Sequence, residues 1–345
     1  MPLGVADGRA LRVGIVGCGR MGHVHARILK SLPGVAVCGV ADADIEKAAH
    51  LAETVPVARA FGGAAELIDE VSPDIVHVLT PPPTHAQLCC AALEAGCHVF
   101  VEKPMAMTEA EARGMIAAAR HHDRLLTVDH NNRFDPTVLR AHAMVLSGAI
   151  GELAGVDIFH NSLPAEAPWV AKLPSGDWFN DIDHLFYLAE FFLGPVARVR
   201  PVSTRSSDGR VVELHVAAEN ERGWSSLTYS TLTAPFQIRL RLYGRRRTLE
   251  VDLMPGLLLV RREVGTHRWL KKGVMILDTA TQLFLQAGLN SVRVLTAQEK
   301  GWGGLRNLLN AFYAAIRNHS RSPVDLETCL RIVNLKQDII LQLHG

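Results

Sequence analysis

The chain has 345 residues, of which 48% are hydrophobic and 21% charged, and its formal net charge is +1. This length suits about two domains with a sizeable core, and the near-neutral charge gives no reason to expect nucleic acid or an anionic membrane as a partner. No apolar run is long enough to span a bilayer, and the first ten residues lack the apolar core of a signal peptide. The six cysteines form no C-x-x-C pattern, which indicates reduced thiols in a cytoplasmic protein with no expected metal site.

The segment from Leu11 to Asp42 dominates the N-terminal part of the sequence. A short apolar run, Val13–Val16, reads as a buried strand. It leads into a G-x-G-x-x-G pattern whose three glycines are Gly17, Gly19 and Gly22. Helical spacing follows, and a second apolar run, Val35–Ala41, ends at Asp42, twenty positions after Gly22.

Each part of this segment has a physical role in holding a dinucleotide. Gly17 permits a tight turn, Gly19 lets a pyrophosphate approach the backbone, and Gly22 allows close packing of helix on sheet. The helix N-terminus offers free N–H groups to the phosphates. Asp42 can accept hydrogen bonds from ribose hydroxyls and would repel a 2′-phosphate, so the sequence favours NAD over NADP.

Strands and helices alternate as far as residue 131, which predicts a doubly wound parallel sheet in a domain of residues 1–131. The remaining strands and helices of this domain are expected as follows: helices over Asp44–Thr54, part of Phe61–Val71, Thr84–Ala95 and Thr108–His121, and strands over Asp74–Thr80, His98–Glu102 and Leu125–His130. Thr84 is expected to cap its helix and Gly96 to end it, and Thr108 with Glu111 is spaced as a capping box.

Residues 132–345 read as an α+β domain with an open, mainly antiparallel sheet. Its clearest strand is Phe236–Tyr243, in which Phe236, Ile238, Leu240 and Leu242 share one face. Further strands are expected at Ala154–His160, Val196–Ser203, Arg210–Ala218, Ser225–Thr231, Thr248–Leu253 and Leu257–Arg262, and helices at Pro136–Leu146, Asp181–Leu193, Leu305–Asn318 and Leu326–Leu343. The C-terminal helices could also pack on the first domain. For His267–Leu289, a lid or a subunit interface is favoured over a membrane-surface helix.

Three short motifs can carry chemistry. Ligands of doubly wound sheets lie beyond the carboxyl ends of the strands, where the first two motifs stand, and the second domain could bring the third there. Thr80 to His85 (TPPPTH) is either a stiff turn with a helix cap or a wall of the cofactor site. Glu102-Lys103-Pro104 places a lysine where it can stabilise an alkoxide, and Pro104 can hold a cis bond. His184, one helical turn after Asn180, is either a core residue or a general base.

Together these motifs resemble the glucose–fructose oxidoreductase / inositol dehydrogenase (Gfo/Idh/MocA) family. The matching residues are the GCGRMG loop with Ala26, Asp42, TPPPTH, Glu102-Lys103-Pro104, Arg133-Phe134 with Pro136, and the histidine helix that ends in Leu193-Gly194. The resemblance implies a Rossmann domain, a second open-sheet domain and a bound NAD(H) or NADP(H). It also implies a homodimer or homotetramer that forms through the C-terminal sheet.

The resemblance assigns roles to individual residues. Lys103 matches the catalytic lysine and His184 the catalytic histidine of the family. Asn180 and Tyr187 stand where aspartates are common, and Ile182 replaces a usual glycine. The expected substrate-binding residues are Asn180, Arg133, His85 and Asp181, and the expected cofactor-binding residues are Gly17, Gly19, Arg20, Met21, Gly22, Asp42, Thr80, Pro81, His85, Glu102 and Lys103.

The resulting hypothesis is an NAD-dependent dehydrogenase that acts on a secondary alcohol of a sugar, cyclitol or nucleotide-linked sugar. One alternative is an NAD-retaining enzyme of the glycosidase type without net redox. Another is a non-catalytic NAD(H)-binding regulatory protein, which is motivated by the neutral Asn180 and Tyr187.

Overall fold

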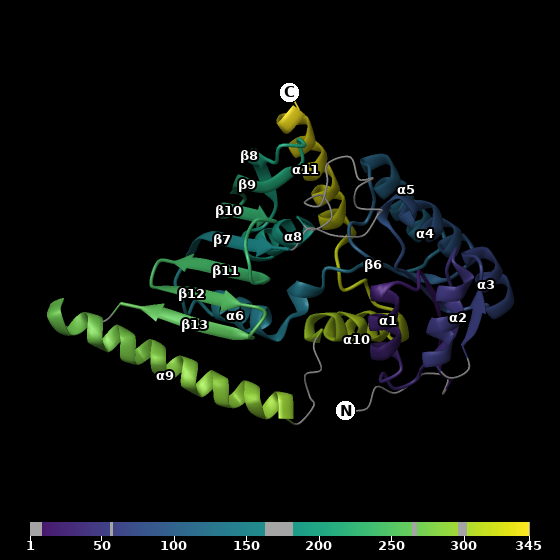
Figure 1. The fold of residues 1–345 in the computed structure, drawn as a ribbon, viewed down its shortest axis with the longest axis horizontal. Coiled ribbons are helices and arrows are strands. Elements are labelled where there is room, and N and C mark those ends of the chain that lie inside the picture. The colour runs from purple at the N-terminus through teal and green to yellow at the C-terminus, as the bar shows by residue number, and fades with distance from the viewer. Residues whose placement is uncertain (1–8, 56–57, 163–181, 264–267, 296–301, 345) are drawn as a thin grey trace. The chain divides into compact units, whose positions relative to one another are not determined.

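The structure is a computed structural model that describes residues 9–55, 58–162, 182–263, 268–295 and 302–344 (Figure 1). The chain divides into two compact units. The first comprises Met1–Asp129 and Leu308–Asn334, and the second comprises His130–Asn307 and Leu335–Gly345. Within the described ranges, none of the helices combines the length and the hydropathy that a bilayer-crossing segment needs.

The first unit is built on a six-stranded sheet in which every pairing is parallel and the strand order is β3-β2-β1-β4-β5-β6. This is the order of a doubly wound dinucleotide-binding fold, so the predicted fold class is confirmed. The strands are β1 Leu11–Val16, β2 Val35–Ala41, β3 Arg59–Phe61, β4 Ile75–Val78, β5 His98–Val101 and β6 Leu126–Val128. Three residues are too few to show an apolar period, which is why the sequence does not predict β3.

The helices of this unit follow the strands in alternation (Figure 1). They are α1 Arg20–Leu29, α2 Ile45–Thr54, α3 Ala64–Val71, α4 His85–Glu94 and α5 Glu109–His121. The capping box of α5 is confirmed, because the Glu111 N–H donates to Thr108 Oγ1 at 3.2 Å and Glu111 Oε2 accepts the Thr108 N–H at 3.1 Å. Thr84 is the N-cap residue of α4, as predicted, but its side chain makes no capping hydrogen bond: the hydroxyl donates to the Pro81 carbonyl, within a 3-10 turn at Pro82–Thr84.

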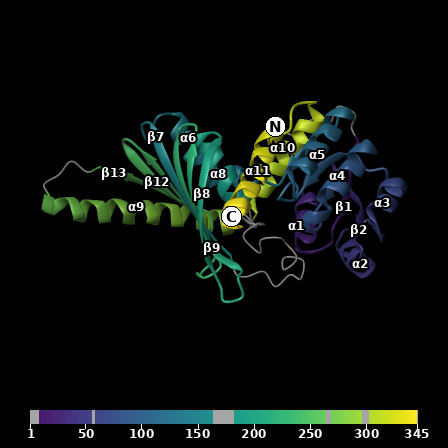
Figure 2. The ribbon, with the colours of Figure 1, turned by 90° about the horizontal axis from the view of Figure 1, so that it is seen from above.

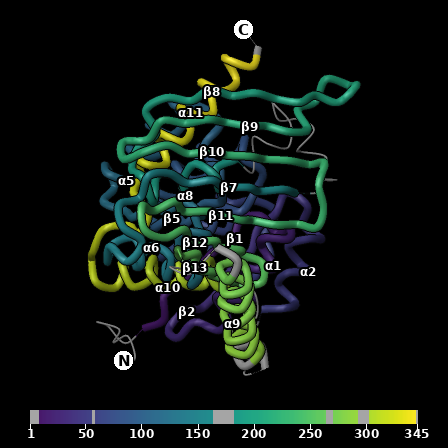
Figure 3. The backbone as a smooth tube through the Cα atoms, turned by 90° about the vertical axis from the view of Figure 1, so that its left-hand side faces the viewer, coloured from purple at the N-terminus to yellow at the C-terminus, as the bar shows by residue number. Residues whose placement is uncertain are grey.

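The second unit is built on a seven-stranded sheet with the order β13-β12-β11-β7-β10-β9-β8, which can be followed in Figure 3. All pairings are antiparallel except the one between β7 and β10. The prediction of an open, mainly antiparallel sheet is therefore confirmed. The strands are β7 Leu153–Asn161, β8 Val196–Arg205, β9 Val211–Asn220, β10 Gly223–Ser230, β11 Gln237–Gly244, β12 Arg247–Asp252 and β13 Leu257–Arg262.

Strand β11 shows the predicted alternation. Ile238, Leu240 and Leu242 are buried on one face. The exposed Arg239 and Arg241 point to the other face, where they pair with acidic side chains of β12. Phe236 is an exception, because the strand begins after it and its side chain is 44% exposed.

Four further elements of this unit are the 3-10 turn η2 (Asn131–Phe134), α6 (Pro136–Leu146), α8 (Asp183–Leu193) and α9 (Arg268–Leu295). Helix α8 packs against β7 and β10, and α9 runs along the β13 edge of the sheet (Figure 2). The last two helices, α10 (Gly303–Arg317) and α11 (Leu326–His344), each continue from one unit into the other.

A buried ion pair fixes the first turn of α8. Lys336 Nζ of α11 lies 2.6 Å from Asp183 Oδ1, and the two side chains are 0% and 2% exposed. The carboxylate also suits the positive N-terminal end of the helix. A charge left behind here without its partner would be strongly destabilising.

Replacing Asp183 by Ala should therefore lower the free energy of unfolding by about 3–5 kcal/mol, because the Lys336 ammonium group stays buried without a carboxylate. The measurement is equilibrium urea unfolding of the whole chain. The double variant Asp183→Asn/Lys336→Met removes both charges and should lose much less stability. A single variant as stable as the wild type would show that the pair does not hold the helix.

Candidate active site

The loop between β1 and α1 has the backbone geometry of a phosphate cradle. Gly17 has a φ of +102°, and a Cβ on it would lie 2.6 Å from the carbonyl group of Leu79. A Cβ on Gly22 would lie 2.4 Å from the Gly17 carbonyl oxygen. Gly19 is different, because a Cβ there would meet nothing within 4 Å. Packing thus requires glycine at positions 17 and 22, whereas Gly19 borders open space.

Asp42 joins this loop to the start of α2, with one carboxylate oxygen bonded to each. Oδ2 accepts the backbone N–H of Cys18 at 2.8 Å, and Oδ1 accepts the N–H of Asp44 at 3.0 Å. Each oxygen keeps a second lone pair, so the carboxylate can also accept hydrogen bonds from a diol. The nearby Cys18 thiol is not a nucleophile, because burial and the charge of Asp42 raise its pKa to about 12.

The N-terminus of α1 completes the cradle. Gly19 caps the helix without a side chain, and the first turn, which includes Arg20 and Met21, holds no acidic residue. Backbone N–H groups and the positive end of the helix dipole are thus available to an anion. The residues present fit a dinucleotide pyrophosphate.

The TPPPTH segment forms the turn after β4, and its histidine is a buried structural residue that contacts two backbone carbonyl groups. His85 is fully buried, with Nδ1 2.8 Å from the Pro104 carbonyl oxygen and Nε2 2.8 Å from that of Thr80. The ring thereby ties this turn to the turn that follows β5. Thr80 and Pro81 lie at the surface of the turn, where the Thr80 and Thr84 hydroxyls are 2.7 Å apart. Contact of His85 with a ligand stays a prediction.

Glu102 and Lys103 follow β5, and the Lys103–Pro104 peptide bond is cis, as the sequence suggested. Lys103 is half-buried, and its N–H donates to Glu102 Oε2 at 3.2 Å. Burial raises the pKa of Glu102, and this effect outweighs the Lys103 charge and a hydrogen bond with Asp129, which both lower it. The carboxyl group is thus a buried support beneath the lysine backbone.

A polar cluster lies next to Glu102 in the core of the first unit. His25 Nε2 is 3.9 Å from Glu102 Oε1, and one ligand atom each of His25, Glu102 and Asp129 lie within 4.8 Å of one another. These residue types can bind a cation. However, the positive charges of Lys103 and Arg20 already act on the Glu102 carboxyl group, and they would repel a cation bound there.

From His25 the cluster continues through the core to α10. His25 Nδ1 lies 2.9 Å from His77 Nδ1, and His77 Nε2 lies 2.9 Å from the hydroxyl of Tyr313. Burial lowers the pKa of His25 to about 3 and that of His77 well below its usual value. Both rings are therefore neutral near pH 7, and they belong to the core rather than to acid–base chemistry.

His184 lies in the first turn of α8, in the second unit, and two polar groups orient its ring. Nδ1 is 2.6 Å from the Tyr187 hydroxyl and 3.2 Å from Asn132 Nδ2. A phenol hydroxyl can donate to Nδ1 or accept from it, so Tyr187 holds the ring in either tautomer. Nδ1 is thus the ring atom that these two groups orient.

Tyr187 is itself fixed. It is fully buried, its ring stacks on His130 with centroids 4.4 Å apart, and its oxygen accepts the Asn132 N–H at 3.2 Å. Burial and the Arg133 charge lower the pKa of His130 well below its usual value. The Arg133 guanidinium lies over the Phe191 ring, 4.8 Å from its centroid.

The structure brings some of the predicted site residues together and does not describe others. The glycine loop and Asp42 come together as expected, and Lys103 and His184 are half-buried, each in its own unit. Asn180 and Asp181 lie outside the described residues. The sequence missed His25 and Asp129 as partners of the Glu102 site, because a histidine on an apolar helix face and an acid at a strand end give no distinctive spacing.

The model of the oxidoreductase family with an NAD-binding Rossmann fold, GFO_IDH_MocA, matches residues 11–130. Among curated relatives, the myo-inositol 2-dehydrogenase of Thermotoga maritima is 30% identical over 185 residues, 53% of this chain and 55% of its own length. For that relative, the chain thus spans about half of the length.

The inositol 2-dehydrogenase of Rhizobium meliloti matches more extensively, with 30% identity over 256 residues, 71% of this chain and 74% of that protein. Among solved structures, the WlbA dehydrogenase from Bordetella pertussis has a TM-score of 0.79 and 18% identity, and the match covers 98% of this chain and 96% of that one. The chain belongs to the Gfo/Idh/MocA family of oxidoreductases.

Proposed function

We propose that the protein is an NAD-dependent oxidoreductase that transfers a hydride between nicotinamide and a secondary alcohol or ketone of a sugar, cyclitol or nucleotide-linked sugar. The observation that carries this proposal is the glycine loop, which Asp42 holds at 2.8 Å and which is open at Gly19. The names of the relatives support the substrate class, since two are inositol dehydrogenases and the WlbA structure is a complex with NADH and UDP-GlcNAcA.

NAD is the proposed cofactor, and NADP the less suitable one. Asp42 presents carboxylate lone pairs at the end of β2 and would repel a 2′-phosphate. Arg20, Met21, Thr80 and Pro81 are proposed to line the same site. Bound nicotinamide supplies the hydride acceptor or donor, and the protein supplies position and charge.

Lys103 is proposed to stabilise negative charge on the reacting oxygen. The residue is half-buried, and its backbone is held by a carboxyl group whose pKa burial raises. Fixed positive charge in a site of low dielectric stabilises an oxyanion more than it does in water. Glu102 acts through Lys103 and is therefore a positioning residue.

His184 is proposed to take or return the hydroxyl proton. Tyr187 stands where the resemblance leads one to expect an aspartate, and its hydroxyl still orients the imidazole. Because a phenol can act as donor or acceptor, the orientation survives the change of protonation state that acid–base catalysis requires. Asn180, Asp181, Arg133 and His85 remain the predicted substrate-binding residues.

The protein is also proposed to be a cytoplasmic homo-oligomer. The structure shows all six cysteines as free thiols, as a reducing compartment would require. The open face of the C-terminal sheet, which carries Arg239 and Arg241 of β11, is the surface that the family resemblance predicts for pairing.

Lys103→Ala should lower kcat/KM by roughly 10²–10³-fold, because one preorganised charge at the reacting oxygen is lost. Binding of NAD should stay within a few fold of the wild type. Turnover is measured on the best substrate from a panel of cyclitols, glucosides and UDP-sugars, and NAD binding by calorimetry. Lys30→Ala, which removes an exposed lysine of the same unit, is the matched control. Unchanged turnover would remove Lys103 from the mechanism.

Tyr187→Phe should lower kcat by roughly 10–100-fold while NAD affinity stays unchanged, because the imidazole loses the hydroxyl that orients it. The same substitution at Tyr243, a half-buried residue of β11, provides the control for a lost phenol group. Full activity in the Tyr187 variant would mean that the ring of His184 needs no such partner.

A further inference from the structure

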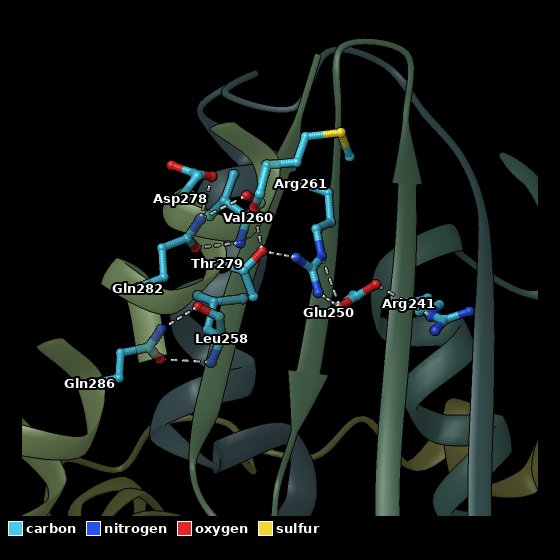
Figure 4. A network of polar contacts seen from close by, with 10 residues as sticks. Arg241, Glu250, Leu258, Val260, Arg261, Asp278, Thr279, Gln282 and Gln286 are labelled. Carbon is cyan, nitrogen blue, oxygen red and sulfur yellow. Dashed lines mark hydrogen bonds and ion pairs between the residues drawn. The ribbon is translucent and has the colours of Figure 1, made fainter. Parts of the chain in front are cut away.

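Helix α9 turns its polar side toward the sheet. Gln286 Oε1 accepts the Leu258 N–H at 2.8 Å, and its Nε2 donates to the Leu258 carbonyl oxygen at 2.8 Å (Figure 4). Gln282, one turn earlier, makes the same pair of bonds with Val260, at 2.8 and 3.0 Å. The two amides thus satisfy the free edge of β13 as a neighbouring strand would.

Further polar side chains of α9 also contact the sheet. Asp278 pairs with Arg262. Thr279 bonds with Arg261, which in turn pairs with Glu250 of β12 (Figure 4). These contacts fix which side of the helix faces the sheet.

The other side of α9 is apolar and open. The helix carries large hydrophobic side chains that are exposed in the chain: Leu270, Val274, Met275, Ile276, Leu277, Leu283, Phe284, Leu285 and Leu289. Leu277 is 68% exposed and Phe284 80%. A surface helix normally buries its apolar stripe, and an exposed patch of this kind marks an interaction site.

Six of the exposed residues of α9 follow a seven-residue period. Leu270, Leu277 and Phe284 are seven apart, and the exposed small residues Gly273, Ala280 and Ala287 are also seven apart, three positions later. Positions offset by three and four within a heptad form the seam of a coiled coil. Within this seam, Leu270, Leu277 and Phe284 occupy one position, and Gly273, Ala280 and Ala287 occupy the other.

This division of sizes favours one arrangement of two identical helices. In a parallel pair, large residues would face large ones and small residues small ones, which gives uneven layers. In an antiparallel pair with its two-fold axis between Asp278 and Thr279, Phe284 meets Gly273, Leu277 meets Ala280, and Leu270 meets Ala287. The largest side chain then lies opposite the residue without one.

We propose that α9 is a self-association surface, on which a second copy of this chain packs its own α9 in antiparallel orientation. Each helix meets its own equivalent across a two-fold axis, so the contact closes on itself. A bilayer surface needs no seven-residue register of large and small residues, so the register favours a second copy.

Gly273→Leu tests the proposal without disturbing the chain itself, because a Cβ on Gly273 meets nothing within 4 Å. The added side chain occupies the space assigned to Phe284 of the second copy. We expect the mass measured by light scattering to fall to half of the wild-type value. The double variant Gly273→Leu/Phe284→Ala should restore the wild-type mass, because it exchanges the large and the small position.

Gly114→Leu is the matched control, since it fills an equally open helical glycine in α5 and should leave the mass unchanged. Circular dichroism checks that each variant keeps its helices. A wild-type mass equal to that of Gly273→Leu would overturn the proposal, and so would a double variant that stays dissociated. Flotation of the wild type as a monomer with phosphatidylcholine/phosphatidylglycerol vesicles would identify a membrane as the partner instead.

Discussion

The carboxylate of Asp42 is the constraint on which the cofactor site depends. It accepts one N–H from the glycine loop at 2.8 Å and one from the start of α2 at 3.0 Å, so a single side chain joins the ends of β1 and β2. The glycines make the tight loop possible, but they do not select one conformation. The carboxylate makes that selection, and the same group favours a ribose diol over a phosphate at this point.

The two proposed catalytic residues are held by different physical means. Lys103 lies above a buried carboxyl group and follows a strand of the parallel sheet, so its backbone is rigid. His184 sits on a helix, and the hydroxyl of a buried tyrosine orients its ring. Buried polar groups are costly unless they are hydrogen-bonded. Their presence under both residues fits the preorganisation that a catalytic site needs.

Local patterns predicted much of this structure, and long-range pairing accounts for most of what they missed. The glycine loop with its acid, the capping box at Thr108 and the alternation in β11 each depend on residues close in sequence. The parallel pairing of β7 with β10 depends on a register set some seventy residues away. The amides of Gln282 and Gln286 that replace a strand at β13 have no sequence signature. From the sequence, Tyr187 appeared only as the absence of an aspartate that the family resemblance leads one to expect. The structure shows that its hydroxyl contacts the His184 imidazole instead.

The most direct test of the account is calorimetric titration of NAD and of NADP into the wild-type chain and into Asp42→Ala. The wild type should bind NAD at least about tenfold more tightly than NADP, a difference of about 1.4 kcal/mol. In Asp42→Ala, NAD should bind more weakly and the preference should disappear, because the clamp and the repulsion are lost together. Equal binding of the two cofactors by the wild type, or an unchanged preference in the variant, would contradict the central role of this carboxylate.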